Sequence, residues 1–417
     1  MSELSSERLS PFEWLRAVAV FCVVMLHACV PYLTHAMQGL AWPVKDAPSS
    51  LINSLFWSIE LFIMPLFLVM AGFFAVSLLR KRGHRDFVKH RASRLLLPLV
   101  VVGAVILPLD LYSWLLGWVV EGQIDFRKLR SLKFEAGQDQ HLWGLSHLWF
   151  LQYLFLYCAV YALAHAYWPA RWQTLSARYW LRRSSLYALF AIGAVTLTIA
   201  PEVVFGFQHS FLPFASKWIY SGTFFAGGIW LAIYDAELRR TRRLGPRVLL
   251  IGVVATIAGV IAGNQYLAGN GSPIVRLLMV TATVAAAWGV PTGLIGVAMR
   301  TLTVSNRAVR YIAAASFWIY LVHHPLMGLL HTDLKVLLPT ASPLLKVTLA
   351  FSVTLLLGLA TFEVAVRRTA LGRLLGVRQP RTGTPWPDAS TEANAAEESV
   401  ESRETARTGT IPLRRAA

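Results

Sequence analysis

The sequence predicts an all-α polytopic membrane protein with about ten transmembrane helices and cytoplasmic N- and C-termini, and three observations support this prediction. Hydrophobic residues make up 56% of the 417 residues, above the roughly 45–50% of soluble domains, and the mean hydropathy is +0.52. These residues gather in runs of about 20, the length with which a helix crosses a bilayer. Lysine and arginine fall in alternate connections between the runs, which is the positive-inside pattern.

The distribution of charge disfavours nucleic acid as a partner. The net charge is +17, but the basic residues alternate with apolar runs instead of forming one continuous surface. We therefore expect a multi-pass protein of the plasma (inner) membrane, with the lipid bilayer as a partner. All cysteines lie in apolar runs, so neither a disulfide nor a metal-ligand spacing is visible, and we expect no metal. They are Cys22, Cys29 and Cys158.

The apolar runs and their flanking charges define the expected spans in chain order. Pro98 and Pro108 interrupt the third run, so we expect a broken helix there. Segment 121–146 mixes acidic and basic residues evenly and is typical of an external loop without a packed core of its own. The expected spans are 14–32, 51–79, 95–120, 147–167, 186–205, 214–234, 248–267, 273–297, 312–330 and 344–366.

The chain divides into three regions. Residues 1–10 form a polar cytoplasmic lead-in, residues 11–368 form the transmembrane domain, and residues 377–417 form a cytoplasmic tail. The tail is rich in threonine, proline, alanine, glutamate and arginine and has almost nothing to bury, so we expect it to be disordered.

The first span carries ionisable residues. Glu13 and Arg16 stand at its start, and His27 lies deep inside it. The eleven residues from Arg16 to His27 return the chain to within about 20° of the same helix face, about 16 Å further along the axis. Glu13, three residues before Arg16, can pair with it. Such groups in a span are candidate functional residues; the alternatives are a structural histidine and a signal peptide, which a histidine inside the apolar core disfavours.

The ninth span carries a second group of polar residues. Ser316, Tyr320 and His323 follow the spacing i, i+4, i+7 and therefore share one helix face. His324 lies next to them in the outer half of the span. An interfacial anchor explains His324 equally well.

Four further residues are candidates at membrane depth. His147 and Trp149 open the fourth span, where an aromatic belt by itself explains Trp149. Glu60 lies inside the second span and is costly unless paired. Asp110 lies toward the outer face, where it either shapes the access of a polar acceptor or takes part in structural pairing.

The densest basic stretch runs from Arg80 to Arg94 and sets the cytoplasmic side of the second connection. Within it, Arg91 and Arg94 are three residues apart directly before the third span, with Lys89 close by. These residues could act as topology signals that also attract anionic lipids. They could equally form a clamp for a cytosolic phosphorylated cofactor, because guanidinium groups bind phosphate bidentately. The residues alone do not decide between the two.

Together, five ordered motifs resemble the membrane acyltransferase-3 family over residues 11–368. The sequences of these motifs most resemble those of the branch that includes the glucan-modifying succinyltransferases. Ala71 stands where that family usually has serine, and Glu13 where aspartate is common. The motifs are Glu13-Trp14-Leu15-Arg16 with ten residues before His27, Phe62 to Phe74, Arg91-Ala92-Ser93-Arg94, His147 to Leu151, and Ser316 to Pro325.

The resemblance implies transfer of an acyl group from cytosolic acyl-CoA to a hydroxyl of an extracytoplasmic glycan. His27 would be the general base, and Arg16, held by Glu13, would stabilise the donor or the developing oxyanion. A short covalent acyl-histidine step is an open alternative to direct transfer. The implied cofactor clamp is Lys89, Arg91 and Arg94, and the implied substrate path is Glu60, His147, Trp149, Ser316, Tyr320, His323 and His324.

Two other classes of function compete. A transporter or flippase for a sugar-lipid or an organic acid is the main alternative, because buried histidine and glutamate residues suit proton coupling. Inverted repeats or paired broken helices would support it, and neither is evident in the sequence. A non-catalytic membrane partner of a glycan-synthesis complex is the third class. Whether the chain works with glycan-synthesis partners or as a homo-oligomer stays open.

Overall fold

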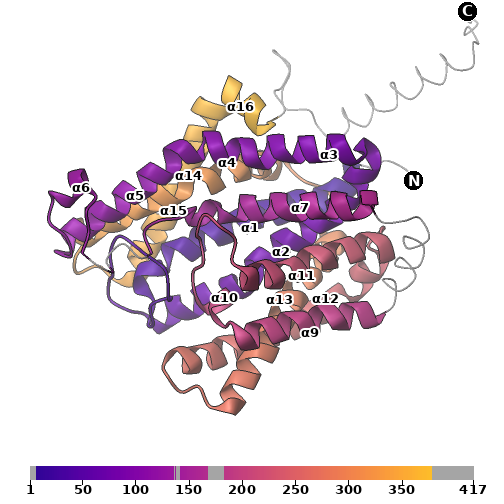
Figure 1. Cartoon of the computed structure of the whole chain (residues 1–417), viewed down its shortest axis with the longest axis horizontal. Coiled ribbons are helices and arrows are strands. Elements are labelled where there is room, and N and C mark those ends of the chain that lie inside the picture. The colour runs from indigo at the N-terminus through magenta and orange to yellow at the C-terminus, as the bar shows by residue number, and fades with distance from the viewer. Residues whose placement is uncertain (1–5, 136, 138–140, 168–182, 378–417) are drawn as a thin grey trace, which may run out of the picture.

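A computed structural model describes residues 6–135, 137, 141–167 and 183–377 of the chain (Figure 1). Over these residues the regular structure is entirely helical, without a β-strand, which confirms the all-α class. Most of the long helices run roughly along the longest axis of the molecule. The predicted tail lies outside the described residues, apart from its first residue.

Eight helices in the described part of the chain are long and apolar enough to cross a membrane, which makes this a multi-pass membrane protein. The predicted count of ten and the cytoplasmic side of the termini stay predictions. Two expected spans do not qualify: α9 (Arg183–Ile199) has only 17 residues, and α11 (Ala215–Tyr234) carries Lys217 among several hydroxyl residues. The eight are α1 (Ser6–Ala28), α2 (Ser50–Arg82), α5 (Gly103–Val120), α7 (Trp149–Tyr167), α12 (Arg239–Leu267), α13 (Pro273–Thr301), α14 (Arg307–Leu337) and α15 (Pro343–Thr361).

The third expected span is broken, as its prolines predict. A π-helical turn, η2 (Ala92–Leu96), precedes the short α4 (Leu97–Val101), which is followed by α5. Pro98 offers no backbone N–H to the carbonyl four residues earlier, which is a physical cause for the irregular turn. The basic stretch that connects the second and third spans is helical rather than a loop: α2 extends to Arg82, and α3 (His84–Arg91) follows after one residue.

Glycines let α2 and α11 pack with their backbones in contact. A Cβ atom at Gly72 would collide with the carbonyl oxygen of Phe225, and one at Gly228 would collide with that of Val69. Small residues at a helix interface allow this approach in membranes, where packing rather than hydrophobicity drives association. The contact fixes α2 and α11 as two walls of the pocket described below.

Segment 121–146, predicted as an external loop without a packed core of its own, packs against α5. Its Ile124 and Leu142 are buried against Trp114 of α5, in a small cluster separate from the main core. The segment also contains the short helix α6 (Lys128–Ser131). The hydrophobic residues of this segment are too few to predict a core by themselves, and they become buried only because α5 extends beneath them.

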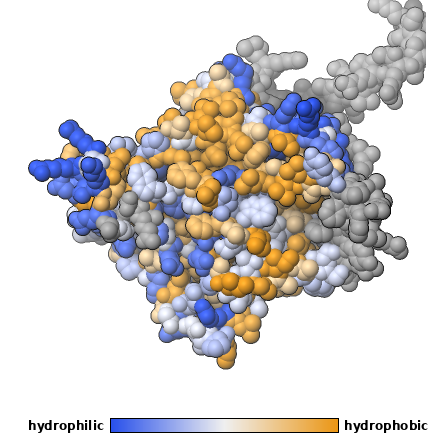
Figure 2. Space-filling model, in the orientation of Figure 1, coloured by the Kyte–Doolittle hydropathy of each residue, from blue (hydrophilic) through white to orange (hydrophobic). Residues whose placement is uncertain are grey.

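The surface is consistent with lipid contact. Figure 2 shows apolar side chains over much of one face, with hydrophilic residues gathered near α6 and α3. Exposed aliphatic residues on the broken third span include Val100, Val105 and Leu109. A contiguous apolar surface of this extent is unusual for a soluble monomer and normal for a protein surrounded by lipid.

Candidate active site

His27 lies one residue before the end of α1, not deep inside the helix as the sequence suggested. The chain turns there into η1 (Val30–Tyr32), which is buried. The His27 ring centroid lies 4.8 Å from that of His323 and 5.0 Å from that of His324, both on α14. The structure therefore brings the predicted base together with two predicted path residues, 296 and 297 positions later in the chain.

Backbone carbonyls fix the proton positions on two of these histidines. His27 Nδ1 lies 2.8 Å from the Val23 oxygen, and His323 Nδ1 lies 2.8 Å from the Tyr320 oxygen. Because a carbonyl only accepts, each neutral ring carries its proton on Nδ1. His323 Nε2, 3.3 Å from His27 Nδ1, is then an acceptor for the same proton. His27 then keeps a lone pair on Nε2, which can accept a proton.

Glu13 and Arg16 interact electrostatically with each other, and each also forms a hydrogen bond with another element. Arg16 donates from Nη2 to the Ser316 hydroxyl of α14 at 3.3 Å. The Glu13 carboxylate instead accepts a hydrogen bond from Ser305, in the connection before α14. The ionisable stripe of α1 thus meets α14 and its leading segment along its length, and the Arg16 side chain stays accessible.

Asp110 of α5 is the centre of a buried polar cluster. Its carboxylate oxygens lie 3.0 Å from His324 Nδ1, 2.7 Å from the Ser146 hydroxyl and 3.4 Å from His147 Nδ1. The Tyr320 hydroxyl donates to the His147 carbonyl at 2.6 Å. The side chain of His324 is 0% exposed, so the alternative of an interfacial anchor is wrong for this residue. The cluster connects α5, the 3₁₀ turn η3 (Ser146–Leu148) before α7, and α14, next to the His27 ring.

The same cluster contains ligand atoms that a metal ion could share. Atoms of Asp110, His147 and His324 lie within 4.8 Å of one another. The sequence shows no such set, because the three residues lie far apart along the chain. Here their oxygens and Nδ1 atoms already contact one another as a hydrogen-bonded cluster, and the expectation of a metal-free site stays a prediction.

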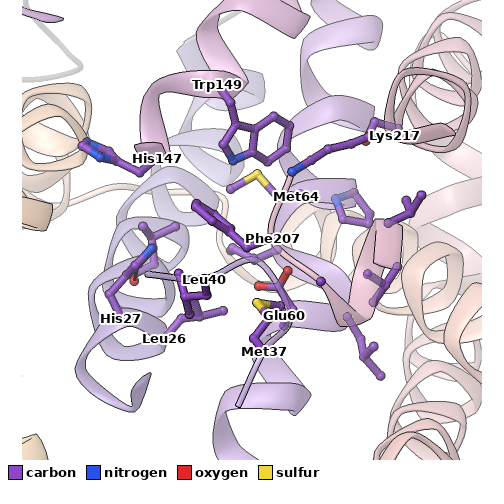
Figure 3. Close-up of a pocket in the computed structure, with 18 of the residues that line it drawn as sticks. Leu26, His27, Met37, Leu40, Glu60, Met64, His147, Trp149, Phe207 and Lys217 are labelled. Atoms are coloured by element: carbon purple, nitrogen blue, oxygen red, sulfur yellow. Dashed lines mark hydrogen bonds between the residues drawn. The ribbon is translucent and has the colours of Figure 1, made fainter. Parts of the chain in front are cut away.

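A pocket opens beside His27, between α1, α2, α7 and α11. It contains about 990 Å³ of space free of atoms, which includes its open mouth. Of the predicted residues, His27, Glu60, His147, Trp149 and Tyr320 line it. Figure 3 shows the two histidines on one side of the pocket, and Trp149 near its top. The other predicted residues lie outside its walls: Glu13, Arg16, Lys89, Arg91, Arg94, Ser316, His323 and His324.

Lys217 of α11 also lines the pocket, and our sequence reasoning missed it. Its side chain is 5% exposed. Its Nζ atom lies 3.5 Å from the centroid of the Trp149 ring and donates to the Gln208 carbonyl at 2.7 Å. Figure 3 shows it across the pocket from His27. A lysine three residues into an apolar run was the available signal, since a buried cation in such a run marks a candidate functional site.

The predicted cofactor residues lie on the helical basic stretch and near its end. The Arg91 guanidinium lies 5.6 Å from the Phe87 ring centroid, and its Nε atom is buried without a hydrogen-bond partner. The Arg94 guanidinium packs against Gly376, the residue that ends α16 (Ala370–Leu375). Lys89 is exposed. Their role in holding a cofactor stays a prediction.

Comparisons with known proteins agree with the resemblance seen in the sequence. A family model described as an acyltransferase domain matches residues 11–363. Curated relatives include the glucans biosynthesis protein C of Salmonella gallinarum, Salmonella agona and Salmonella dublin. Each is 25% identical over 338 residues, which cover 78% of this chain and 84% of the relative. No solved structure matches the chain.

Proposed function

Because the chain belongs to the acyltransferase family, we propose that it is a membrane-bound O-acyltransferase acting on glycans. It moves an acyl group of the acetyl or succinyl class from cytosolic acyl-CoA to a hydroxyl of an extracytoplasmic or envelope glycan, in the plasma (inner) membrane. The name of the relatives, glucans biosynthesis protein C, supports the glycan acceptor. The observation that carries the proposal is the unprotonated Nε2 of His27 beside a pocket between the helices.

His27 acts as the general base in this mechanism. The proton of the acceptor hydroxyl moves to His27 Nε2 while the hydroxyl oxygen attacks the thioester carbonyl. The carbon–sulfur bond then breaks, the new ester stays on the acceptor, and the thiolate of CoA takes the proton from His27. In the protonated ring, Nδ1–H faces two acceptors, the Val23 carbonyl and His323 Nε2, which stabilise the positive charge.

Asp110 supports the same step from a distance. Its carboxylate binds His324 Nδ1, and the His324 ring lies 5.0 Å from that of His27. A fixed buried anion behind the base favours the imidazolium that forms during transfer, because a low-dielectric site strengthens the attraction. Asp110 and His324 are positioning residues in this proposal, since neither lines the pocket.

The donor enters from the end of α1 that carries Arg16. Arg16 lies about 16 Å along the helix from His27, a distance that the thin pantetheine arm of CoA crosses while its phosphates stay in the cytosol. The exposed Arg16 side chain supports binding of an anionic group at this end of α1, and Arg91 belongs to the proposed phosphate clamp. Lys89 and Arg94 complete the proposed phosphate clamp.

Transfer by purified protein in proteoliposomes tests the proposal. With acyl-CoA on one side and a soluble glucan on the other, wild-type protein acylates the glucan, and His27→Ala reduces the rate by about 10²–10⁴-fold. His84→Ala is the matched control, because His84 pairs with His165 and neither residue lines the pocket. A His27→Ala protein that transfers at the wild-type rate, at equal protein amount, refutes the assignment of the base.

A further inference from the structure

Three polar side chains of the pocket take no part in the mechanism above. Glu60 belongs to α2, and Lys217 and Tyr220 belong to α11, one turn apart. All three line the pocket that also contains His27. Figure 3 shows Lys217 in the upper part of the pocket and Glu60 in its lower part, with Met64 at a height between the two.

These groups have hydrogen-bonding capacity that the described residues do not use. Tyr220 is only 5% exposed, and its buried hydroxyl has no hydrogen-bond partner among the described residues. Lys217 uses one of its three donors, toward the Gln208 carbonyl. Neither a hydrogen bond nor an ion pair joins Glu60 to any residue that the structure describes. Unpartnered buried polar groups are costly, so a fold retains them where a ligand completes them.

A second buried lysine shows what a purely structural pair looks like in this protein. Lys346 Nζ contacts the Asp46 carboxylate directly, at 2.7 Å, outside the pocket. Glu60 and Lys217 form no such direct contact, although both line the same pocket. The packing of α2 against α11 holds them apart and leaves space between a carboxylate and an ammonium group.

We propose that Glu60, Lys217 and Tyr220 form the subsite that binds the hydroxyl groups of the acceptor sugar. This inference rests on the proposed function and names the place of one substrate in the pocket. A sugar ring offers hydroxyls that donate to the carboxylate and accept from the ammonium group and the phenol. A ligand with acceptors only, such as a carboxylate, satisfies Lys217 but offers no donor to Glu60.

The walls around these groups suit a sugar ring. Trp149 and Phe207 supply aromatic surface, and the Lys217 ammonium lies over both rings, 3.5 Å and 5.7 Å from their centroids. Pockets that are mostly apolar with a few convergent polar groups fix the orientation of a bound ligand. Because His27 lines the same pocket, a sugar held here presents a hydroxyl to Nε2.

Calorimetric titration of the full-length protein in detergent with a soluble β-linked gluco-oligosaccharide, without any acyl donor, tests the subsite. Lys217→Met weakens binding about tenfold or more, since a hydrogen bond to a charged group is lost. Tyr220→Phe weakens it about threefold to tenfold and leaves thermal stability unchanged or raised, because the hydroxyl has no partner in the fold. Lys335→Met, at a partly exposed lysine outside the pocket, binds like wild type.

The possible results are distinct. Wild-type protein that does not bind the oligosaccharide, or Lys217→Met and Tyr220→Phe proteins that bind it as tightly as wild type, overturns the subsite. Lys217-dependent binding of succinate without binding of the sugar overturns it as well and identifies a carboxylate site. Wild-type protein that binds the sugar but transfers no acyl group from acyl-CoA refutes the proposed function and leaves the subsite standing.

Discussion

Replacing Asp110 by alanine removes the acceptor on which three side chains of the buried polar cluster converge. Ser146 and His324 donate to this carboxylate at 2.7 Å and 3.0 Å, and His147 lies at 3.4 Å. Asp110 itself is 1% exposed, and the three partners are buried, so water does not replace the lost acceptor easily. We expect Asp110→Ala to destabilise the fold and to reduce activity together.

The expected loss of folding free energy in Asp110→Ala follows from the two short contacts, those of Ser146 and His324. A buried donor left without an acceptor costs about 1–3 kcal/mol. Counting Ser146 and His324 alone gives about 2–6 kcal/mol, a range that includes the 3–5 kcal/mol typical of a broken buried ion pair. Asp110→Asn keeps one acceptor oxygen but turns an amide N–H toward one of the donors. Its expected cost is therefore smaller, about 1–3 kcal/mol.

Equilibrium unfolding of the detergent-solubilised protein measures this loss. Asp125→Asn is a matched control, because Asp125 is exposed and its carboxylate accepts a hydrogen bond from the backbone N–H of Arg127. We expect the order of stability to be Asp125→Asn equal to wild type, then Asp110→Asn, then Asp110→Ala. If Asp110→Ala unfolds at the wild-type denaturant concentration, the cluster contributes nothing to stability and our account of it is wrong.

Three further predictions concern packing, the cofactor and pH. We expect Gly72→Leu to separate α2 from α11 and to abolish stable accumulation of the protein in the membrane. Normal accumulation of the Gly72→Leu protein contradicts the close backbone contact. Arg91→Ala combined with Arg94→Ala weakens acyl-CoA binding at least about tenfold in a filter assay, whereas Arg85→Ala, an exposed residue of the same basic stretch, does not; equal binding by all three proteins leaves the stretch as a topology signal. Burial lowers the pKa of His209, in the loop before α11, to about 4. In the unfolded chain this histidine binds a proton near pH 6.5, so the folded state loses stability as the pH falls from about 6.5 to about 4, on the order of 3 kcal/mol. We expect His209→Gln to remove this part of the pH dependence of the free energy of unfolding. An unchanged pH dependence contradicts the burial of His209.

The sequence by itself determined the features that depend on local composition and spacing. Runs of apolar residues set the all-α membrane class, and Pro98 predicted the break in the third span. Helical periodicity placed Arg16 and His27 on one stripe of α1, and that stripe does face one neighbour, α14. These inferences succeed because hydropathy and turn geometry act over a few residues. The family motifs are local in the same sense.

Only the tertiary structure decided which distant residues share a site. Asp110 and His324 are 214 positions apart, and no local pattern predicts their contact. Lys217 became a pocket residue because α11 packs its glycine-lined face against α2. Glu13 and Arg16, although one turn apart, form their hydrogen bonds with other elements. Packing decides such contacts, because it determines which side chains come within hydrogen-bonding distance, whatever their separation along the chain.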